Sequence, residues 1–446
     1  MDSIISLYIA AGCVASLSLG VLWPKPEYGL FLYGLMLGFP DLALDTGAIN
    51  VRLDDLLLLF LVCRTIIWPD EPLTGGQLRV LRWQILFASL CLVSAGVGIA
   101  NGKPPDSYEA AKLIGCLIII VSLPILLDCV RRLRFLVAGL MCGGVCLVSQ
   151  IVYHLASSSG NIMANFQELK WAASFATWNP NTIGQAGALL AFGAGLGSII
   201  YPTSRLRASV WVWLSAVFAL TPLSLFARGS GLAIATGYVT FLWLTQRYRM
   251  ALLVVMLGVG AMIYLYGSQN PVVASATHID IRTGEGFSHR YDRWSVAVAA
   301  IRGSPTIGYG FGREGLTLKE LGGEGPAHNA YLSVWIELGL IGLAMLLTAV
   351  FQYVSVSLSL YKTPPFRPSG ALLIALLLTV CIDSCALHTL YWEKLTTIAL
   401  AIGMALIGIC ERQRTDQNRT WNVPHRSQPL YSDSDSPLHP VYHGVT

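Results

Sequence analysis

Charged residues are scarce in this sequence. Asp, Glu, Lys and Arg account for 12% of its 446 residues, whereas roughly a quarter of a soluble domain is charged. Apolar residues account for 54%, and about twelve spans of about 20 residues each would use a similar share of the chain. This composition excludes a soluble enzyme, a disordered protein and a secreted disulfide scaffold. It predicts an all-α polytopic membrane protein.

Features of nucleic-acid-binding, disulfide-rich and zinc proteins are also lacking. The 29 basic and 25 acidic residues give a net charge of only +4, which does not indicate nucleic acid as a partner. All ten cysteines lie inside apolar segments, so neither a disulfide framework nor a zinc-ligand spacing is present. The one Asp-x-Asp motif, Asp433 to Asp435, lies in the C-terminal tail. We predict no metal site and no cofactor.

Apolar runs predict twelve or thirteen transmembrane helices. Spanning segments must be helical, because lipid offers no hydrogen-bond partner to a free backbone group. The first run has no basic segment before it and is followed at once by another, so we interpret it as a retained span rather than a signal peptide. The first two runs can also form one re-entrant unit. The runs are residues 4–23, 29–45, 53–68, 83–100, 113–130, 135–156, 181–201, 208–226, 229–246, 250–266, 329–352, 369–390 and 393–410.

Basic residues are unevenly divided between the two alternating sets of short loops. One set holds thirteen Lys and Arg residues and the other holds six. Because short cytoplasmic loops carry the excess of positive charge, the first set is predicted to be cytoplasmic. The long loop 267–328 then lies on the outer face, within a transmembrane domain of residues 1–410. The polar segment 411–446 is predicted to be a disordered cytoplasmic tail.

Arg228 lies between two apolar runs with almost no loop around it. An arginine so close to hydrocarbon is costly unless it is paired, reaches the interface or binds an anion. Gly229 and Gly231 would let another backbone or a phosphate approach closely. A boundary arginine that extends towards water is the alternative interpretation.

Two more arginines, Arg290 and Arg293, lie in the long loop. They would share one side of a helical turn if the segment is helical. Arginine suits diphosphate because its planar fork makes bidentate, charge-assisted hydrogen bonds. The alternative is a solvated charged loop in which Arg293 pairs with an acidic residue. The glycines at 308, 310 and 312 are more typical of turns than of a phosphate-binding nest.

His328 and Asn329 open the span that follows the long loop. A neutral histidine at the membrane boundary can accept a proton near neutral pH. Its alternative role is to cap the start of the helix. Glu337 lies nine residues further on, so helix geometry turns it away from His328 and towards a neighbouring span.

Other polar residues lie on the same predicted face. Asp54 and Asp55 begin a span, where carboxylates favour the helix dipole and free N–H groups, so we interpret them mainly as helix caps. Asp383, His388 and Glu393 flank the last outer turn and can line the same cavity.

Together these segments resemble the bacterial O-antigen ligase and O-antigen polymerase superfamily. The resemblance is clearest over about residues 175–345, and it rests on the order and placement of short motifs around one long outer loop. The segment 51–55 is more similar to exopolysaccharide polymerases than to ligases. The matching residues are Asn179, Pro180, Asn181, Arg228, Gly229, Arg290, Trp294, Pro305, Gly308, Gly310, Gly312, His328, Asn329, Glu337 and Gly339.

The resemblance implies a GT-C-like membrane glycosyltransferase fold in the bacterial inner membrane, with its active site in the periplasm. The donor is then an undecaprenyl-diphosphate-linked glycan, and the acceptor is lipid A–core or another lipid-linked glycan. By matching positions, Arg228 and Arg290 bind the diphosphate and His328 activates the acceptor hydroxyl. Arg293 and Asn329 are assigned to the same substrate site. The transfer would be inverting and independent of a metal.

A transporter or flippase of the lipid-linked saccharide is the alternative. It should place ionisable groups near mid-membrane and often has broken helices in internal repeats. Here the notable charges lie near the outer boundary, and the two halves show no repeat. The choice between polymerase and ligase stays open, as do the sugar, the linkage, the acceptor and the oligomeric state.

Overall fold

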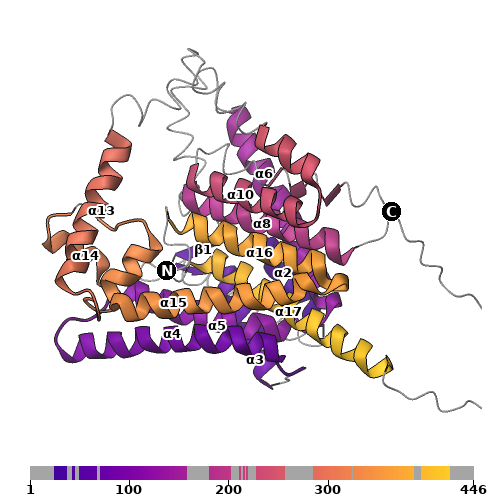
Figure 1. Ribbon diagram of the computed structural model, residues 1–446, viewed down its shortest axis with the longest axis horizontal. Coiled ribbons are helices and arrows are strands. Elements are labelled where there is room, and N and C mark those ends of the chain that lie inside the picture. Colours follow the sequence, from indigo (N-terminus) through magenta and orange to yellow (C-terminus); the bar gives the residue numbers. More distant parts are fainter. Residues whose placement is uncertain are drawn as a thin grey trace, which may run out of the picture.

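Helices account for most of the chain that the structure describes, and one small strand pair accompanies them (Figure 1). The structure is a computed structural model. It describes residues 25–37, 43–45, 50–67, 71–157, 180–201, 210–211, 214–215, 217–218, 228–256, 285–323, 325–385 and 393–421.

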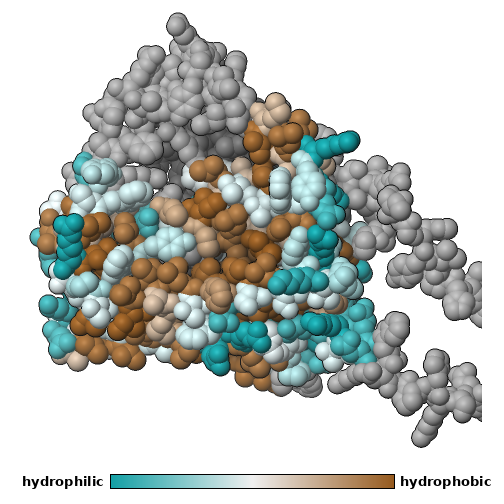
Figure 2. Space-filling model, viewed as in Figure 1, coloured by the Kyte–Doolittle hydropathy of each residue, from teal (hydrophilic) through white to brown (hydrophobic). Residues whose placement is uncertain are grey.

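In this described part of the chain, six helices are long and apolar enough to cross a membrane. They are α4 (Gly75–Ala100), α5 (Ser107–Leu126), α6 (Val130–Ser157), α15 (Ala330–Lys362), α16 (Arg367–Asp383, after the 3-10 turn η2, Pro364–Phe366) and α17 (Lys394–Trp421). The bundle also contains α2 (Pro26–Met36), α3 (Leu53–Ile67), α8 (Pro180–Ile200) and α10 (Arg228–Leu244). Figure 2 shows apolar side chains across the middle of the bundle and polar ones towards its ends, as a lipid-facing belt requires. The predicted class, an all-α polytopic membrane protein, is confirmed.

Helix α17 lies at the centre of the bundle. Ile398, Ala401, Ile402, Met404 and Ile407 are all fully buried, although they point in different directions around the helix. A helix that is apolar on every side is stable only when other helices surround it. Helices α4, α5, α8, α15 and α16 are packed around α17, and α4 is broadly exposed on its other side.

One predicted span is wrong. Residues 29–45 do not form a single helix, because α2 ends and the short strand β1 (Ala43–Asp45) pairs antiparallel with β2 (Asn50–Arg52). Pro40 lies inside the run, and proline can neither donate a backbone hydrogen bond nor continue a helix without distorting it. The predicted spans 4–23 and most of 208–226 and 250–266 lie outside the described residues.

The predicted tail boundary is also wrong. Helix α17 continues to Trp421 instead of ending near 410. Glu411 accepts a hydrogen bond from the backbone N–H of Gly76 at 2.8 Å, and Arg412 donates to the carbonyl of Asp128. These contacts with the start of α4 and with the segment before α6 hold the extra turns. Residues 422–446 lie outside the described residues.

The two sets of basic residues lie at opposite ends of the bundle. At one end, Lys394 contacts Asp54 at 2.7 Å, close to the residues where α10 and α15 begin and α16 ends. We call this the site end. At the other, far end, Arg131 contacts Glu27 at 3.5 Å and Arg132 contacts Asp128 at 3.1 Å. The bundle thus reproduces the charge asymmetry that the loops indicated.

Helices α2 and α6 cross at very short range. A Cβ atom at Gly139 would clash with the backbone carbonyl of Phe31, and one at Gly34 would lie 2.6 Å from the carbonyl oxygen of Leu136. Small residues permit such backbone contact between membrane helices.

Gly139→Ala should therefore lower the stability of the protein by about 1–3 kcal/mol, the usual cost of overpacking. Gly96→Ala is the matched control, because no atom lies within 4 Å of a Cβ at Gly96 in α4. Alanine is the better helix former, so this control should be neutral or stabilising. The measurement is the thermal unfolding midpoint of each purified protein. Equal midpoints for the two variants would contradict the close crossing.

Candidate active site at one end of the bundle

Helix α15 is interrupted at Gly339, where φ is 66° and ψ is −166°. The loop Pro305–Gly310 lies in the break and replaces the missing helical hydrogen bonds. These bonds run from Tyr309 N–H to the Ile336 carbonyl (2.8 Å), from Gly310 N–H to the Glu337 carbonyl (2.8 Å) and from Leu340 N–H to the Pro305 carbonyl (2.9 Å). The backbone groups that the break releases are thus bonded within the protein, as a hydrocarbon surrounding requires.

The glycines of this region allow the loop and the helix to touch. A Cβ atom at Gly308 would clash with the backbone of Glu337, and one at Gly339 would clash with the carbonyl of Thr306. Both glycines also have positive φ, 71° at Gly308 and 66° at Gly339, which disfavours any residue with a Cβ. The glycine series therefore forms turns against a broken helix.

Two buried carboxylates connect the region of the break to the loop before α15. Glu337, 2% exposed, accepts a hydrogen bond at 2.9 Å from the backbone N–H of Glu314, the first residue of α14 (Glu314–Glu320). Glu314, 7% exposed, accepts one at 2.8 Å from the backbone N–H of Ala327. Glu337 thus contacts α14, and its predicted orientation away from His328 and towards a neighbouring span stays a prediction. The two carboxylates connect the broken helix to the residue before His328.

The peptide groups of Ala327 are held from two directions. Its N–H donates to Glu314, and its carbonyl accepts a hydrogen bond at 3.0 Å from the indole of Trp294 in α13 (Glu285–Gly303). The next residue, His328, is half-buried and has a φ of 50°. A positive φ is uncommon outside glycine and persists only where the surroundings impose it, which happens most often at functional sites.

Asn329 is the N-cap of α15. Its side-chain oxygen accepts hydrogen bonds from the N–H groups of Tyr331 and Leu332 at 3.0 and 3.1 Å. Its side-chain nitrogen donates to the carbonyl of Cys385 at 3.1 Å. The capping role considered for His328 thus belongs to Asn329, and the histidine is placed just outside the helix.

The end of α16 joins the starts of α10 and α15. The Ser230 hydroxyl in α10 donates to Asp383 at 2.9 Å, and both side chains are buried. The Ala330 N–H in α15 donates to the carbonyl of Ser384 at 2.9 Å. Arg228 is the first residue of α10, so α16 brings the beginnings of the Arg228 helix and the His328 helix to the same end of the bundle. Two helix N-termini with partial positive charge suit an anionic group.

Arg290 and Arg293 lie in α13, which extends beyond the site end of the bundle (Figure 1). The segment is helical, which meets the condition for their sharing one side of a turn. Arg293 is half-buried, whereas the side chains of Arg228 and Arg290 lie outside the described residues. Helix α13 is held by a small apolar core formed by Ala297, Ala300, Ile301, Leu318, Ala327 and Ile336.

A second polar group connects α3, α5 and α17 at the site end. Lys112 contacts Glu393 at 3.1 Å, and Lys394 contacts both Asp54 and Asp55. Asp54 and Asp55 therefore form ion pairs between helices in addition to the capping position that the sequence indicated. Burial raises the pKa of Glu393, and the adjacent Lys112 opposes this shift. Within the described ranges, no group of three or more His, Cys, Asp or Glu side chains could hold a metal ion. The predicted His388 lies outside these ranges.

Sequence reasoning gave no role to Glu314, Trp294 or Ser230. Glu314 and Trp294 bind the backbone of Ala327, and a backbone N–H or carbonyl leaves no trace in a sequence motif. Ser230 bonds Asp383, which the sequence did place near the site. For Trp294, its position in the sequence next to Arg293 was the available indication that it belongs to the site.

Comparison with known proteins places a known domain over this region. Residues 213–347 match the model of the family described as O-antigen ligase. No curated protein matches the chain. The matched segment contains α10, α13, α14 and the first part of α15, the elements that carry the three arginines and His328.

The buried Glu314 gives a pH-dependent stability. Burial raises the pKa of its carboxyl from 4.5 to about 7, although the N–H of Ala327 and the hydroxyl of Ser333 oppose this shift. The folded protein therefore keeps a proton that the unfolded chain has already lost. Stability should fall as the pH rises from 4.5 to about 7 and change little above that.

Glu314→Gln should remove this dependence, because an amide keeps the oxygen that accepts from Ala327 and cannot ionise. We expect the wild type to lose roughly 1–3 kcal/mol more than the variant between these limits. Thermal unfolding midpoints at pH 5 and pH 8 measure the difference. Parallel changes in the two proteins would show that Glu314 does not titrate in this range.

Proposed function

The chain belongs to the superfamily of O-antigen ligases and polymerases, and we propose that it transfers a glycan from undecaprenyl diphosphate to an acceptor hydroxyl. The observation that carries this proposal is the junction at the end of α16, where the helices that begin with Arg228 and at His328 meet. We place the site end at the periplasmic face of the bacterial inner membrane. The excess of basic residues at the far end supports this orientation.

Arg228, Arg290 and Arg293 bind the donor diphosphate in this proposal. The bond between the sugar and the diphosphate breaks during transfer, and negative charge grows on the leaving undecaprenyl diphosphate. Fixed guanidinium groups and the N-termini of α10 and α15 stabilise that charge in the transition state. Guanidinium groups would do this without a divalent ion, so the transfer is metal-independent.

His328 is the general base. It removes the proton from the acceptor hydroxyl while the oxygen attacks the anomeric carbon from the side opposite the diphosphate, and the product is inverted. The positive φ of His328 and the two hydrogen bonds that hold Ala327 support this role, because a base needs a fixed position. Asn329 acts at the same place by fixing the start of α15, in addition to the substrate contact assigned to it.

The acceptor is lipid A–core in a ligase or another lipid-linked glycan in a polymerase. Both present a sugar hydroxyl to the same base, so the chemistry proposed for His328 serves either reaction.

A transporter of the lipid-linked saccharide is the alternative, and one observation favours it. Transporters use broken helices to line a substrate path, and α15 is broken at Gly339. However, the loop Pro305–Gly310 already bonds the released backbone groups. A cavity within the bundle is also lined mainly by apolar side chains and does not suit a saccharide.

His328→Asn should reduce turnover by about 10²–10⁴-fold while leaving donor binding intact. Asparagine tolerates positive φ, so the variant removes the base without disturbing the backbone. Release of undecaprenyl diphosphate from a glycan-loaded donor, measured with EDTA present, gives the rate. His443→Asn, in the C-terminal segment, is the control. Full turnover by His328→Asn would exclude His328 as the base, and loss of wild-type turnover with EDTA would exclude the metal-independent reaction.

Arg290→Gln should lower the turnover number by about 10²–10³-fold, the usual cost of losing one group that stabilises transition-state charge. Arg302→Gln is the matched control, because Arg302 is an exposed arginine in the last turn of the same helix. The same release assay compares the two. Equal effects would mean that the overall charge of α13 matters and that a specific contact of Arg290 does not.

A further inference from the structure

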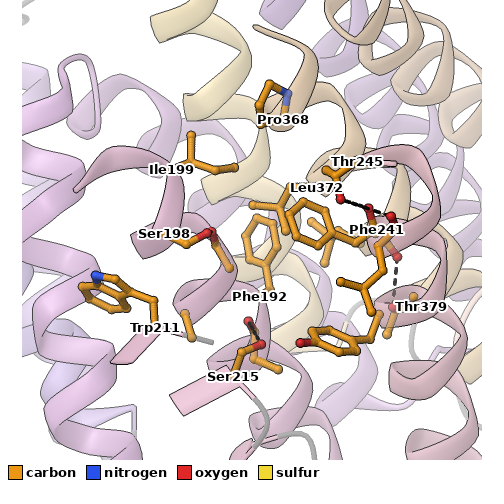
Figure 3. Close-up of a pocket in the computed structure, with 18 of the residues that line it drawn as sticks. Phe192, Ser198, Ile199, Trp211, Ser215, Phe241, Thr245, Pro368, Leu372 and Thr379 are labelled. Carbon is orange, nitrogen blue, oxygen red and sulfur yellow. Dashed lines mark hydrogen bonds between the residues drawn. The ribbon is translucent and has the colours of Figure 1, made fainter. Parts of the chain in front are cut away.

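A cavity of about 530 Å³ lies between α8, α10 and α16 (Figure 3). It extends along the bundle from the level of Thr379 and Ser215 to that of Thr245 and Pro368. Its volume falls within the range of about 300–1,000 Å³ typical of small-molecule sites. The cavity is therefore large enough to hold part of a lipid chain.

One wall of the cavity is a row of small residues on α8. Ala188, Ala191, Gly195 and Ser198 follow one another at helical spacing, and all four are half-buried. Small residues in membrane helices normally let a neighbouring helix approach closely. Here they face the cavity instead, together with Phe192 of the same helix and others from α10 and α16.

Most of the hydroxyls on the walls are bonded to the helices themselves. Four of the five donate to a backbone carbonyl: Ser198 to Gly195 (2.6 Å), Ser215 to Ala191 (3.3 Å), Thr245 to Phe241 (2.8 Å) and Thr379 to Ala375 (2.9 Å). The fifth hydroxyl belongs to Tyr238. Figure 3 shows Thr245 and Thr379 turned towards their own helices. The walls thus offer mainly apolar contact, which suits a hydrocarbon chain better than a sugar.

Helix α10 connects the cavity to the candidate active site. Ile234 is the first residue of α10 that lines the cavity, and a rise of about 1.5 Å per residue places it about 9 Å along the helix from Arg228. The bond between Ser230 and Asp383 fixes the first turn of α10 to the last turn of α16. The same two helices therefore carry the diphosphate end and two walls of the cavity.

We propose that this cavity binds a segment of the polyprenyl chain of the donor, with the diphosphate at the start of α10. This inference rests on the proposed function, because that function supplies the polyprenyl diphosphate. The competing occupant is a phospholipid acyl chain, with its headgroup at Arg247 beside the far mouth of the cavity. Because α10 begins at Arg228 and also lines the cavity, the polyprenyl chain is favoured.

The test compares the binding of undecaprenyl diphosphate and geranyl diphosphate to the purified full-length protein. Ala191→Phe fills the cavity, and Ala188→Leu is a milder variant one turn away. Ala235→Phe is the matched control, because Ala235 lies on the exposed face of α10 and does not line the cavity. Comparing variants removes the effect of detergent on each lipid.

The preference for the long chain is the ratio of the affinity for undecaprenyl diphosphate to that for geranyl diphosphate. We expect Ala191→Phe to lower this preference by about tenfold, and Ala188→Leu to lower it by less. Loss of contact with even two methylene groups has an effect of this size. Ala235→Phe should keep the wild-type preference. Unchanged preference in both cavity variants would overturn the proposal. If these variants instead lose co-purified phospholipid at unchanged preference, the cavity belongs to an acyl chain.

A parallel glycan-transfer assay distinguishes a failure of the proposed function from a failure of the proposed lipid site. If the wild type shows no glycan transfer while Ala191→Phe still lowers the chain-length preference, the proposed function fails and the lipid site stands. If transfer occurs and the preference is unchanged in the cavity variants, the lipid site fails and the function stands.

Discussion

The break in α15 is the constraint on which the candidate site depends. A helix interrupted inside a membrane protein exposes backbone groups that lipid cannot bond. The loop Pro305–Gly310 must therefore stay in the break, and this fixes α13 on one side of it and α14 on the other. Trp294 from α13 and Glu314 from α14 then hold Ala327. The position of His328 thus follows from the requirement that the backbone groups released by the break in α15 be hydrogen-bonded.

Charge at the site end is organised by the same principle of local pairing. Lys112 and Lys394 contact carboxylates on neighbouring helices and so connect α3, α5 and α17. These lysines stabilise the bundle, and their contacts are with the protein. In the proposed function the diphosphate is bound instead by arginines and by the starts of α10 and α15, where planar forks and backbone N–H groups match its oxygen atoms.

Hydropathy predicted α3 well, because the predicted span 53–68 and the helix Leu53–Ile67 differ by one residue. The start of α15 differs from its predicted start by one residue, whereas Pro40 ended the predicted span 29–45 early. Helix geometry predicted that Glu337 turns away from His328. It could not reveal that Glu337 bonds Glu314 and that Glu314 bonds Ala327, because this connection runs through backbone N–H groups. The extension of α17 was missed for the same reason, since Glu411 bonds the backbone of Gly76.

In the proposed function, the polyprenyl chain of the donor and the acceptor hydroxyl are bound by different parts of the fold. The pair α10 and α16 is rigidly joined by Ser230 and Asp383, and it carries both the Arg228 end and the apolar cavity. The base is held at the start of α15 by α13 and α14, which lie at the bundle end. A different donor lipid would therefore change contacts along α10 and α16, deep within the bundle. A different acceptor would change contacts at α13 and α14, where exposed residues such as Tyr291 and Leu316 lie. Acceptor choice can therefore differ between a ligase and a polymerase without altering how the polyprenyl chain is held.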